Sequence, residues 1–384
     1  MKILMVHPHD IYSPLEPWTI RVVRLACQLA ANGHQVTLAH FPYSAGEVRS
    51  LPGVFVVGME RKMSAGAFCR NGWRLYQLAR GVDVVHFQKS QFYAALPAVV
   101  AAYLAGRHLH YDWDDWEEKI FYKAIERSSL STCLTGASFF FMERMLPILA
   151  DSTSVASEAL RQLVVARGAD QSRVVWIPVG ADLQQFNPGQ DGLPLRKRYD
   201  LTTEILVFYH GQLHSCQYGG LFLEAIKCVC AGDQGRRMKF MIVGSGSDLN
   251  RLRALAQDLG VAERVIFTGF VPHHEVADYI AAADICVAPF EDNEVTRCKS
   301  PLKIVEYLAS GKPVVASDVG EISRMLDGAG ILVKPGCPQA LAQGMLKLAQ
   351  DKQLRCALSV QARLRAAKFN WKALAEKLEM AYVA

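Results

Sequence analysis

The sequence predicts an α/β protein made of two doubly wound parallel sheets that face each other across a cleft. Short apolar segments alternate with segments of helical periodicity from the first residues onward. These apolar segments are almost continuously hydrophobic, which is typical of strands covered on both faces of a parallel sheet. The pattern restarts after Phe186–Pro194, a segment with two prolines and two glycines that is the best linker candidate in the chain.

The first half of the chain predicts one sheet and its covering helices. Leu25 and Leu29 lie at helical spacing, and Asn32-Gly33 is a C-cap signal that ends their helix. We assign residues 1–186 to an N-terminal domain. Its predicted strands are residues 2–6, 35–39, 54–57, 83–87, 109–112, 152–155 and 174–177, and its predicted helices include residues 20–31, 72–80 and 91–105.

The second half repeats the alternation and predicts a second domain over residues 187–369. A last apolar stripe, with Trp371, Leu374, Leu378 and Tyr382 at spacings of three or four, predicts a helix at the end of the chain. The predicted strands are residues 205–209, 239–243, 265–267, 285–288, 313–316 and 331–333. The predicted helices are residues 221–230, 248–259, 274–282, 302–310, 339–350 and 353–369.

Composition excludes several classes of protein. Of the 384 residues, 51% are hydrophobic and 21% charged, which is enough apolar material for a sizeable core. The net charge of +5 is too mild for a dedicated nucleic-acid binder. The ten cysteines form no C-x-x-C pair, which favours reduced thiols in the cytoplasm. The longest uncharged stretch considered, residues 92–106, falls short of the ~20 residues of a membrane span, so we expect no transmembrane helix.

The segment Ser300–Ile322 carries the most chemical information. Pro301 is a favoured first-turn residue of the helix that follows, and a helix N-terminus suits a phosphate. Lys303 adds a full positive charge in the first turn. Glu306 lies about one turn further on, where a carboxylate can accept hydrogen bonds from ribose hydroxyls. The alternative is a surface Lys–Glu pair on an ordinary helix.

This segment resembles the donor site of the family 4 glycosyltransferases, which are retaining enzymes of the GT-B fold. It is most similar to a subgroup with an SPLK-type donor motif that lacks the first of two family glutamates. The resemblance runs over nearly the whole chain, through NGHQVTLA (32–39), DVVHF (83–87), ADSTSVAS (150–157), VVWIPVGADLQQF (174–186), YHGQL (209–213), MIVGSGSD (241–248), VIFTGFVP (265–272) and ADICVAPF (283–290).

The resemblance implies a hexosyltransferase. It would move a sugar with retention from a nucleotide-diphosphate sugar, UDP before GDP, to a hydroxyl of a saccharide, a lipid-linked saccharide or a small molecule. The donor would bind the second domain and the acceptor the first. The family also places a C-terminal helix, here residues 370–384, back on the first domain. No cofactor and no metal are expected, and the D-x-D sequence of residues 112–114 is discounted as a metal site.

The donor site implied by the family departs from its pattern at several residues. Glu306 matches the glutamate that contacts the ribose, while Cys298 stands where the first glutamate would be. Gln212 and Gln217 replace the Arg and Lys that hold the diphosphate. We expect a cluster of nearby cations to replace those charges. The cations are Arg297, Lys299 and Lys303, and the further donor-binding candidates are Ser300, Leu302, Gly211, Gln212, Gly244, Ser245 and Val271.

The acceptor side implied by the family also departs from its pattern. Glu16-Pro17 stands in place of a Gly-Gly pair, so Glu16, Trp18 and Arg21 are candidates to contact a sugar, with a core Trp as the alternative. Asp114 aligns with a histidine near the donor sugar and is a catalytic candidate, with a helix-capping acid as the alternative.

Other readings of the sequence remain open. The same fold serves nucleotide-sugar epimerases and disaccharide phosphorylases. The lost charges also suit a catalytically inactive nucleotide-sugar binder that partners an active transferase. A basic aromatic face formed by Arg61-Lys62 and the helix around Trp73 suggests a peripheral contact with the inner face of a membrane, with a solvated helix as the alternative.

Overall fold

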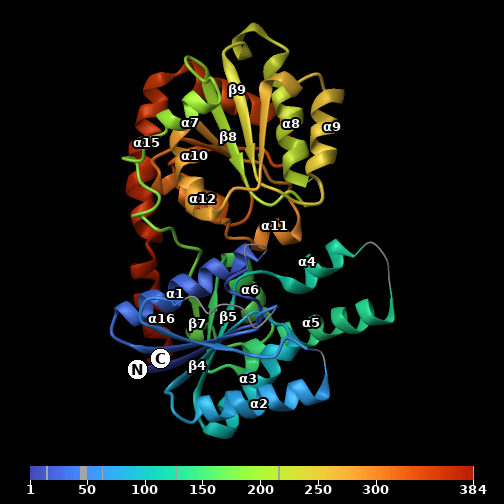
Figure 1. The fold of residues 1–384 in the computed structure, drawn as a ribbon, viewed down its shortest axis with the longest axis vertical. Coiled ribbons are helices and arrows are strands. Elements are labelled where there is room, and N and C mark those ends of the chain that lie inside the picture. The colour runs from blue at the N-terminus through green and yellow to red at the C-terminus, as the bar shows by residue number, and fades with distance from the viewer. Residues whose placement is uncertain (14–15, 44–49, 63, 126–128, 215–216, 384) are drawn as a thin grey trace. The chain divides into compact units, whose positions relative to one another are not determined.

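The computed structural model describes residues 1–13, 16–43, 50–62, 64–125, 129–214 and 217–383. The chain divides into two compact units, shown in Figure 1. Unit 1 comprises Met1–Val179, Cys298–Ser300 and Trp371–Ala384, and unit 2 comprises Gly180–Arg297 and Pro301–Asn370. Each unit is a Rossmann-like domain built on one parallel sheet, so the predicted fold class is confirmed.

Unit 1 contains a seven-stranded parallel sheet in the order β3-β2-β1-β4-β5-β6-β7. All of its strands were predicted from their apolar segments. The chain reverses its direction of winding between β1 and β4, and ligands of doubly wound sheets bind beyond the carboxyl ends of the strands at such a point. The strands are β1 (Lys2–His7), β2 (Gln35–His40), β3 (Val54–Gly58), β4 (Val84–Gln88), β5 (His108–Trp113), β6 (Ser152–Val155) and β7 (Val174–Trp176).

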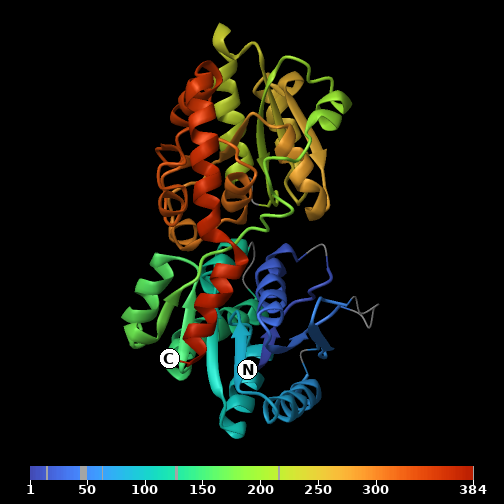
Figure 2. The same cartoon turned by 90° about the vertical axis from the view of Figure 1, so that its left-hand side faces the viewer.

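The helices of unit 1 include the last helix of the chain. Helix α16 lies beside α1, as Figure 2 shows, and its Tyr382 hydroxyl is 2.7 Å from Nδ1 of His86 on β4. Glu379 accepts a hydrogen bond of 2.6 Å from the side chain of Asn32. The helices are α1 (Ile20–Ala31), α2 (Ala65–Ala79), α3 (Phe92–Ala105), α4 (Glu117–Ala124), α5 (Leu130–Leu149), α6 (Glu158–Ala166) and α16 (Trp371–Val383).

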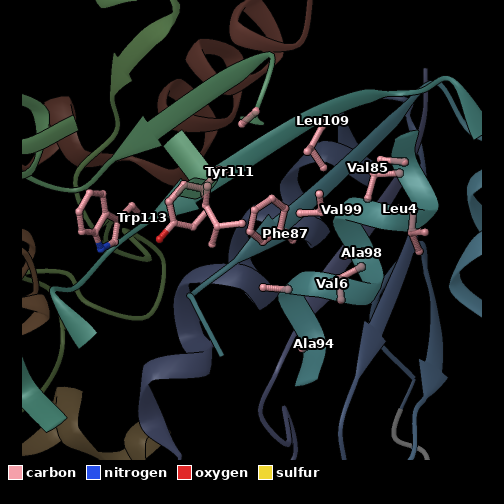
Figure 3. Close-up of a cluster of buried hydrophobic side chains, with 14 of the residues drawn as sticks. Leu4, Val6, Val85, Phe87, Ala94, Ala98, Val99, Leu109, Tyr111 and Trp113 are labelled. Carbon is pink, nitrogen blue, oxygen red and sulfur yellow. The ribbon is translucent and has the colours of Figure 1, made fainter. Parts of the chain in front are cut away.

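The core of unit 1 contains a row of aromatic rings, drawn in Figure 3. Phe87 and Tyr111 stack with centroids 4.9 Å apart, and Tyr111 and Trp113 follow at 6.0 Å. Tyr111 and Trp113 share a face of β5 because they are two residues apart. Helix α3 contributes alanines to the same core, such as Ala94 and Ala98. The row runs toward the carboxyl end of β5, where the candidate site of this unit begins.

Unit 2 contains a six-stranded parallel sheet in the order β10-β9-β8-β11-β12-β13, and all its strands were predicted. They are β8 (Ile205–His210), β9 (Met238–Val243), β10 (Val265–Gly269), β11 (Ile285–Ala288), β12 (Val314–Ser317) and β13 (Gly330–Val333). The helices are α7 (Leu193–Arg198), α8 (Gln217–Cys230), α9 (Leu249–Asp258), α10 (Val276–Ala282), α11 (Glu294–Cys298), α12 (Leu302–Ala309), α13 (Ile322–Leu326), α14 (Pro338–Gln350) and α15 (Lys352–Ala366).

The segment expected to link the two halves packs into unit 2. The units change over between Val179 and Gly180, before the boundary expected at residue 186. Phe186 is buried, and a Cβ added at Gly192 would lie 2.4 Å from the backbone nitrogen of Ala282. In the part of the chain that the structure describes, no helix is long and apolar enough to cross a membrane.

Candidate functional site

Two glycine loops meet at the carboxyl ends of β8 and β9 in unit 2. Gly211 follows β8 with φ +153°, and Gly244 follows β9 with φ +145°, a backbone region that favours glycine. The Gly211 N–H donates to the carbonyl of Val243 at 3.0 Å. A Cβ added at Gly244 would lie 1.9 Å from the carbonyl oxygen of Gly211. The two loops therefore interlock, and a side chain at residue 244 would push them apart.

Lys303 in the first turn of α12 reaches the first of these loops. Its Nζ lies 4.2 Å from the ring centroid of Tyr209, and a Cβ added at Gly211 would come within 2.8 Å of it. Leu302 begins α12 directly after Pro301. An ammonium group, a helix N-terminus and a glycine backbone thus converge, and each of these favours a phosphate.

Glu306, one turn further along α12, lies between two histidines. Its Oε1 is 2.5 Å from Nε2 of His273, and its Oε2 is 3.1 Å from Nε2 of His210. The carboxylate is fully buried, which opposes ionisation, yet the two imidazoles lower the pKa of Glu306 to about 2. Burial in turn lowers the pKa of His210. Glu306 is therefore an ionised carboxylate that is held inside unit 2.

The other donor-side candidates of unit 2 lie on the loops that follow β8, β9 and β10. Gln212 and Ser245 are exposed, and the Ser245 carbonyl accepts from the Leu213 N–H at 3.0 Å. Val271 is half-buried and lies between β10 and the short 3-10 helix that begins at His273. Gln217 begins α8, and its side chain lies outside the described residues.

The three cations expected to bind the diphosphate, Arg297, Lys299 and Lys303, belong to both units. Arg297 of unit 2 makes a two-pronged ion pair with Asp292, at 2.6 and 2.9 Å. Lys299 belongs to unit 1, where its Nζ is 3.7 Å from Asp115. The Ser300 hydroxyl, also in unit 1, accepts from the Val179 N–H at 3.0 Å. The third cation, Lys303, lies against Gly211 of the first glycine loop.

Cys298 lies in the hydrophobic core of unit 1, where its side chain is buried. The interpretation of Cys298 as a buried thiol is therefore confirmed. A buried thiol cannot perform the electrostatic role of the carboxylate that the family has at this position.

A second group of polar side chains gathers at the point in unit 1 where the winding reverses. Lys89 follows β4 with φ +71°, and its Nζ lies 2.6 Å from Glu117 and 3.2 Å from Asp114. Asp114 also accepts from the side chain of Gln88 at 2.8 Å. Burial, opposed by Lys89, raises the pKa of Asp114 to about 6. His7 at the end of β1 is fully buried, and neither ring nitrogen has a hydrogen-bond partner among the described residues.

Glu16 is buried in unit 1, where its carboxylate accepts several hydrogen bonds. Its carboxylate accepts from both terminal nitrogens of Arg61 at 3.0 and 2.9 Å, from the Tyr43 hydroxyl at 3.0 Å and from the Asp10 N–H at 2.7 Å. His9 Nδ1 lies 2.8 Å away. These donors outweigh the effect of burial and hold the pKa of Glu16 well below its usual value. Its hydrogen bonds join the segment before α1 to the segments after β2 and β3.

Trp18 and Arg21 are also engaged within unit 1. The Trp18 ring meets His9 edge-on, with centroids 5.3 Å apart. Arg21 is buried and pairs with Asp112 through two hydrogen bonds of 2.8 Å, while its third nitrogen donates to the Pro178 carbonyl at 3.0 Å. Ser154 donates to the same carboxylate at 2.5 Å. Arg21 thus ties α1 to β5 and to the segment after β7.

Sequence reasoning missed His210, His273 and Lys89 as site residues. His210 ends β8, Lys89 directly follows β4, and His273 comes four residues after the end of β10; the carboxyl ends of parallel strands are where ligands bind. That placement was the available signal. Among the described residues, no group of three or more His, Cys, Asp or Glu side chains is arranged to hold a metal ion.

Comparison with known families gives two matches that lie on the two halves of the chain. Residues 204–351 match the family "Glycosyl transferases group 1", and residues 19–180 match "Glycosyl transferase 4-like domain". The D-inositol 3-phosphate glycosyltransferase of Nocardia farcinica is 34% identical over 59% of this chain and 51% of its own length. That of Corynebacterium jeikeium is 30% identical over 59% and 55%. The chain thus spans about half the length of these curated relatives.

Solved structures share the fold at low sequence identity. Anabaena HepE in complex with UDP and glucose superposes with a TM-score of 0.75, 18% identity and full coverage of both chains. Sucrose-phosphate synthase from Thermosynechococcus elongatus gives 0.75 and 20% identity, over 99% of this chain and 98% of its own. Both halves of the chain thus match glycosyl transferase families, and the two-sheet fold is the one that solved GT-B glycosyltransferases share.

Proposed function

We propose that this protein transfers a hexosyl group from a nucleotide-diphosphate sugar, UDP before GDP, to a hydroxyl of a saccharide, a lipid-linked saccharide or a small molecule, with retention. The observation that carries the proposal is the arrangement on α12. Lys303 reaches the glycine loop, and Glu306 lies one turn away as a buried, ionised carboxylate. The names of the relatives support glycosyl transfer, and HepE was solved with UDP.

Unit 2 would hold the donor. The diphosphate would lie over the N-terminus of α12, with Lys303 and the backbone at Gly211 and Gly244 around it. Negative charge grows on the diphosphate as the glycosidic bond breaks, so a preorganised cation there lowers the barrier. Arg297 is a second candidate cation, and its ion pair with Asp292 would have to open first.

Unit 1 would hold the acceptor. Asp114, supported by Lys89, would orient the attacking hydroxyl or stabilise positive charge at the anomeric carbon. The leaving phosphate would guide attack on the face that it vacates, which preserves the configuration. No cofactor or metal is assigned a role.

A lipid-linked acceptor would bring the protein to the inner face of a membrane. The basic aromatic face offers Trp73, which is 62% exposed, but Arg61 and Arg70 are paired with Glu16 and Glu60. The burial of Cys298 favours one alternative, a catalytically inactive nucleotide-sugar binder.

Release of nucleoside diphosphate from UDP- and GDP-sugars, with and without saccharide acceptors, tests the proposal. We expect the release to depend on an acceptor. Lys303→Ala should lower the turnover by a larger factor than it lowers the affinity for the bare nucleoside, because Lys303 acts on the diphosphate. Lys227→Ala, which alters an exposed lysine of α8, is the control and should leave turnover unchanged. Tight donor binding without any turnover would favour the inactive binder. Equal losses for nucleoside and nucleotide would show that Lys303 does not face the diphosphate.

A further inference from the structure

We infer that the acceptor of this protein is a saccharide hydroxyl with no anionic group beside it, so that neutral and amino sugars are used in preference to sugar phosphates. The inference rests on the proposed function, because it narrows the class of acceptor that unit 1 would hold. It sets this chain apart from the curated relatives, which are named for a phosphorylated molecule, D-inositol 3-phosphate.

The side chains that carry the inference come from the carboxyl ends of three neighbouring strands in unit 1. His7 ends β1 and Gln88 ends β4, while Asp114 directly follows Trp113 at the end of β5, where the aromatic row of Figure 3 stops. In the sheet, β1 pairs with β4 and β4 with β5. The three side chains therefore lie at one edge, where a doubly wound sheet binds its ligand.

The cations at this edge are paired with carboxylates. Lys89 Nζ lies 2.6 Å from Glu117 and 3.2 Å from Asp114, and Lys299 Nζ lies 3.7 Å from Asp115. The Lys89 side chain is 3% exposed, whereas those of Asp114 and Glu117 are 11% and 14% exposed. A ligand that enters from solvent therefore meets carboxylate oxygens before it meets the Lys89 ammonium group. Like charges repel, so this order disfavours a phosphate and favours an amine.

Two buried neutral side chains at this edge have polar atoms without a hydrogen-bond partner among the described residues. Gln88 is 1% exposed, and its Nε2 donates to Asp114 at 2.8 Å while its Oε1 has no partner. Neither ring nitrogen of His7 has a partner. Burial lowers the pKa of His7 well below its usual value, and Lys89 and Gln88 are close enough to influence it. Since an unpaired buried polar atom is costly, these atoms point to a bound group.

The chemistry of these atoms selects a group that donates hydrogen bonds. The Gln88 amide oxygen and the ionised carboxylates only accept hydrogen bonds, and a phosphate dianion also only accepts them. A phosphate therefore cannot satisfy these atoms. A sugar hydroxyl both donates and accepts, and so does the ring of a neutral His7, which has one donor and one acceptor nitrogen. An ammonium group of an amino sugar would donate to the carboxylates.

Pairs of acceptors that differ by one charged group test the inference. Release of nucleoside diphosphate from the UDP- or GDP-sugar with the highest turnover is measured with glucose against glucose 6-phosphate, with inositol against inositol 3-phosphate, and with glucosamine against glucosamine 6-phosphate. We expect kcat/KM for the unphosphorylated member of each pair to be higher by about tenfold or more, because a like-charge contact opposes the phosphate. Equal or higher values for the phosphorylated members would overturn the inference.

Glu117→Gln tests whether the carboxylates cause this discrimination. It removes one negative charge and one partner of Lys89, so kcat/KM for the phosphorylated acceptor should rise about tenfold relative to that for its neutral partner. Glu158→Gln on α6 is the matched control, since the Glu158 side chain is 31% exposed and pairs with Arg161 at 3.7 Å, and it should leave the ratio unchanged.

The possible failures can be told apart. If the phosphorylated acceptors are preferred, or if Glu117→Gln leaves the ratio unchanged, the inference is wrong, although the proposed function stands because sugar is still transferred. If the donor binds and no acceptor of either kind supports release, the proposed function and the inference both fall in favour of an inactive binder. Should Glu117→Gln not fold, as judged by thermal melting, Asp115→Asn replaces it, because it removes a neighbouring carboxylate that is 26% exposed.

Discussion

At the level of single residues, the contacts of Glu306 make its ionisation a source of stability. The pKa of Glu306 is lowered from 4.5 to about 2, so the folded state holds this proton less tightly than the unfolded chain does. Its stabilising effect is therefore fully present above pH 4.5 and is lost as the pH falls toward 2.

We expect Glu306→Gln to flatten this pH dependence. The unfolding free energy of the wild type should fall more steeply than that of the variant as the pH is lowered from 4.5 to about 2. Urea denaturation at several pH values measures it. Parallel curves for the two proteins would mean that the His210 and His273 contacts do not hold the carboxylate ionised.

The same variant should bind nucleotide less well. Loss of a charge-assisted hydrogen bond to the nucleotide costs roughly 1.5–3 kcal/mol of UDP or GDP affinity. Isothermal titration calorimetry on a folded Glu306→Gln protein measures this loss. An unchanged affinity would contradict the assignment of α12 to the donor site.

Asp114 shows the opposite shift, with a pKa of about 6. If its carboxylate orients the acceptor hydroxyl, turnover should rise with pH through 6 as Asp114 loses its proton. Asp114→Asn should lower turnover by about a hundredfold and abolish this rise. A pH–rate profile of both proteins checks this. Retention of the rise in the variant would assign it to another group.

At the level of elements, the ion pair of Arg21 and Asp112 joins α1 to β5 inside unit 1. Their side chains are 4% and 1% exposed. Removing one partner leaves the other charge buried, which costs about 3–5 kcal/mol. Asp112→Asn should lower the unfolding free energy by that amount in chemical denaturation. Glu60→Gln, which breaks the exposed pair with Arg70, is the control and should cost less than about 1 kcal/mol.

Strands and helices were predictable from the sequence where their buried side chains form a regular apolar pattern. Every strand of the two sheets was predicted, because strands covered on both faces are short apolar runs. Helix α5 was missed because it exposes Leu134 and Phe141 while burying Glu143, so its pattern does not mark one apolar face. Helix α12 was predicted from its apolar periodicity after Pro301, and Lys303 and Glu306 were placed on it.

The candidate site was less predictable than the elements that carry it. The pairing of Glu306 with His210 and His273 requires three segments to converge after folding, and residue spacing does not encode that convergence. In the same way, the ion pairs of Arg297 with Asp292 and of Lys299 with Asp115 could not be read from the spacing of the expected cations. Glu16 is a candidate to contact a sugar, and its hydrogen bonds with Arg61 and Tyr43 were not readable from the sequence either.

At the level of the whole molecule, unit 1 is assembled from both ends of the described chain. Removal of residues 371–384 should lower the melting temperature of unit 1 and leave nucleotide binding by unit 2 intact, because α16 buries its apolar face in unit 1. Leu374 and Leu378 are fully buried, and each such side chain contributes about 1.5–3 kcal/mol. Calorimetric melting with and without UDP distinguishes the two units, because UDP should raise the melting temperature of unit 2 alone. Loss of UDP binding on truncation would contradict the assignment of the donor site to unit 2.

The place of α16 has a consequence for synthesis on the ribosome. Residues Gly180–Arg297 and Pro301–Asn370 leave the exit tunnel before α16 does, so unit 2 has its whole sequence available while unit 1 still lacks a helix. Until then the surface that α16 covers, including His86 and His110 beside Tyr382, stays open to water. The rest of unit 1 therefore lacks α16 until residues 371–383 have emerged. In this interval its uncovered apolar surface can bind chaperones or aggregate.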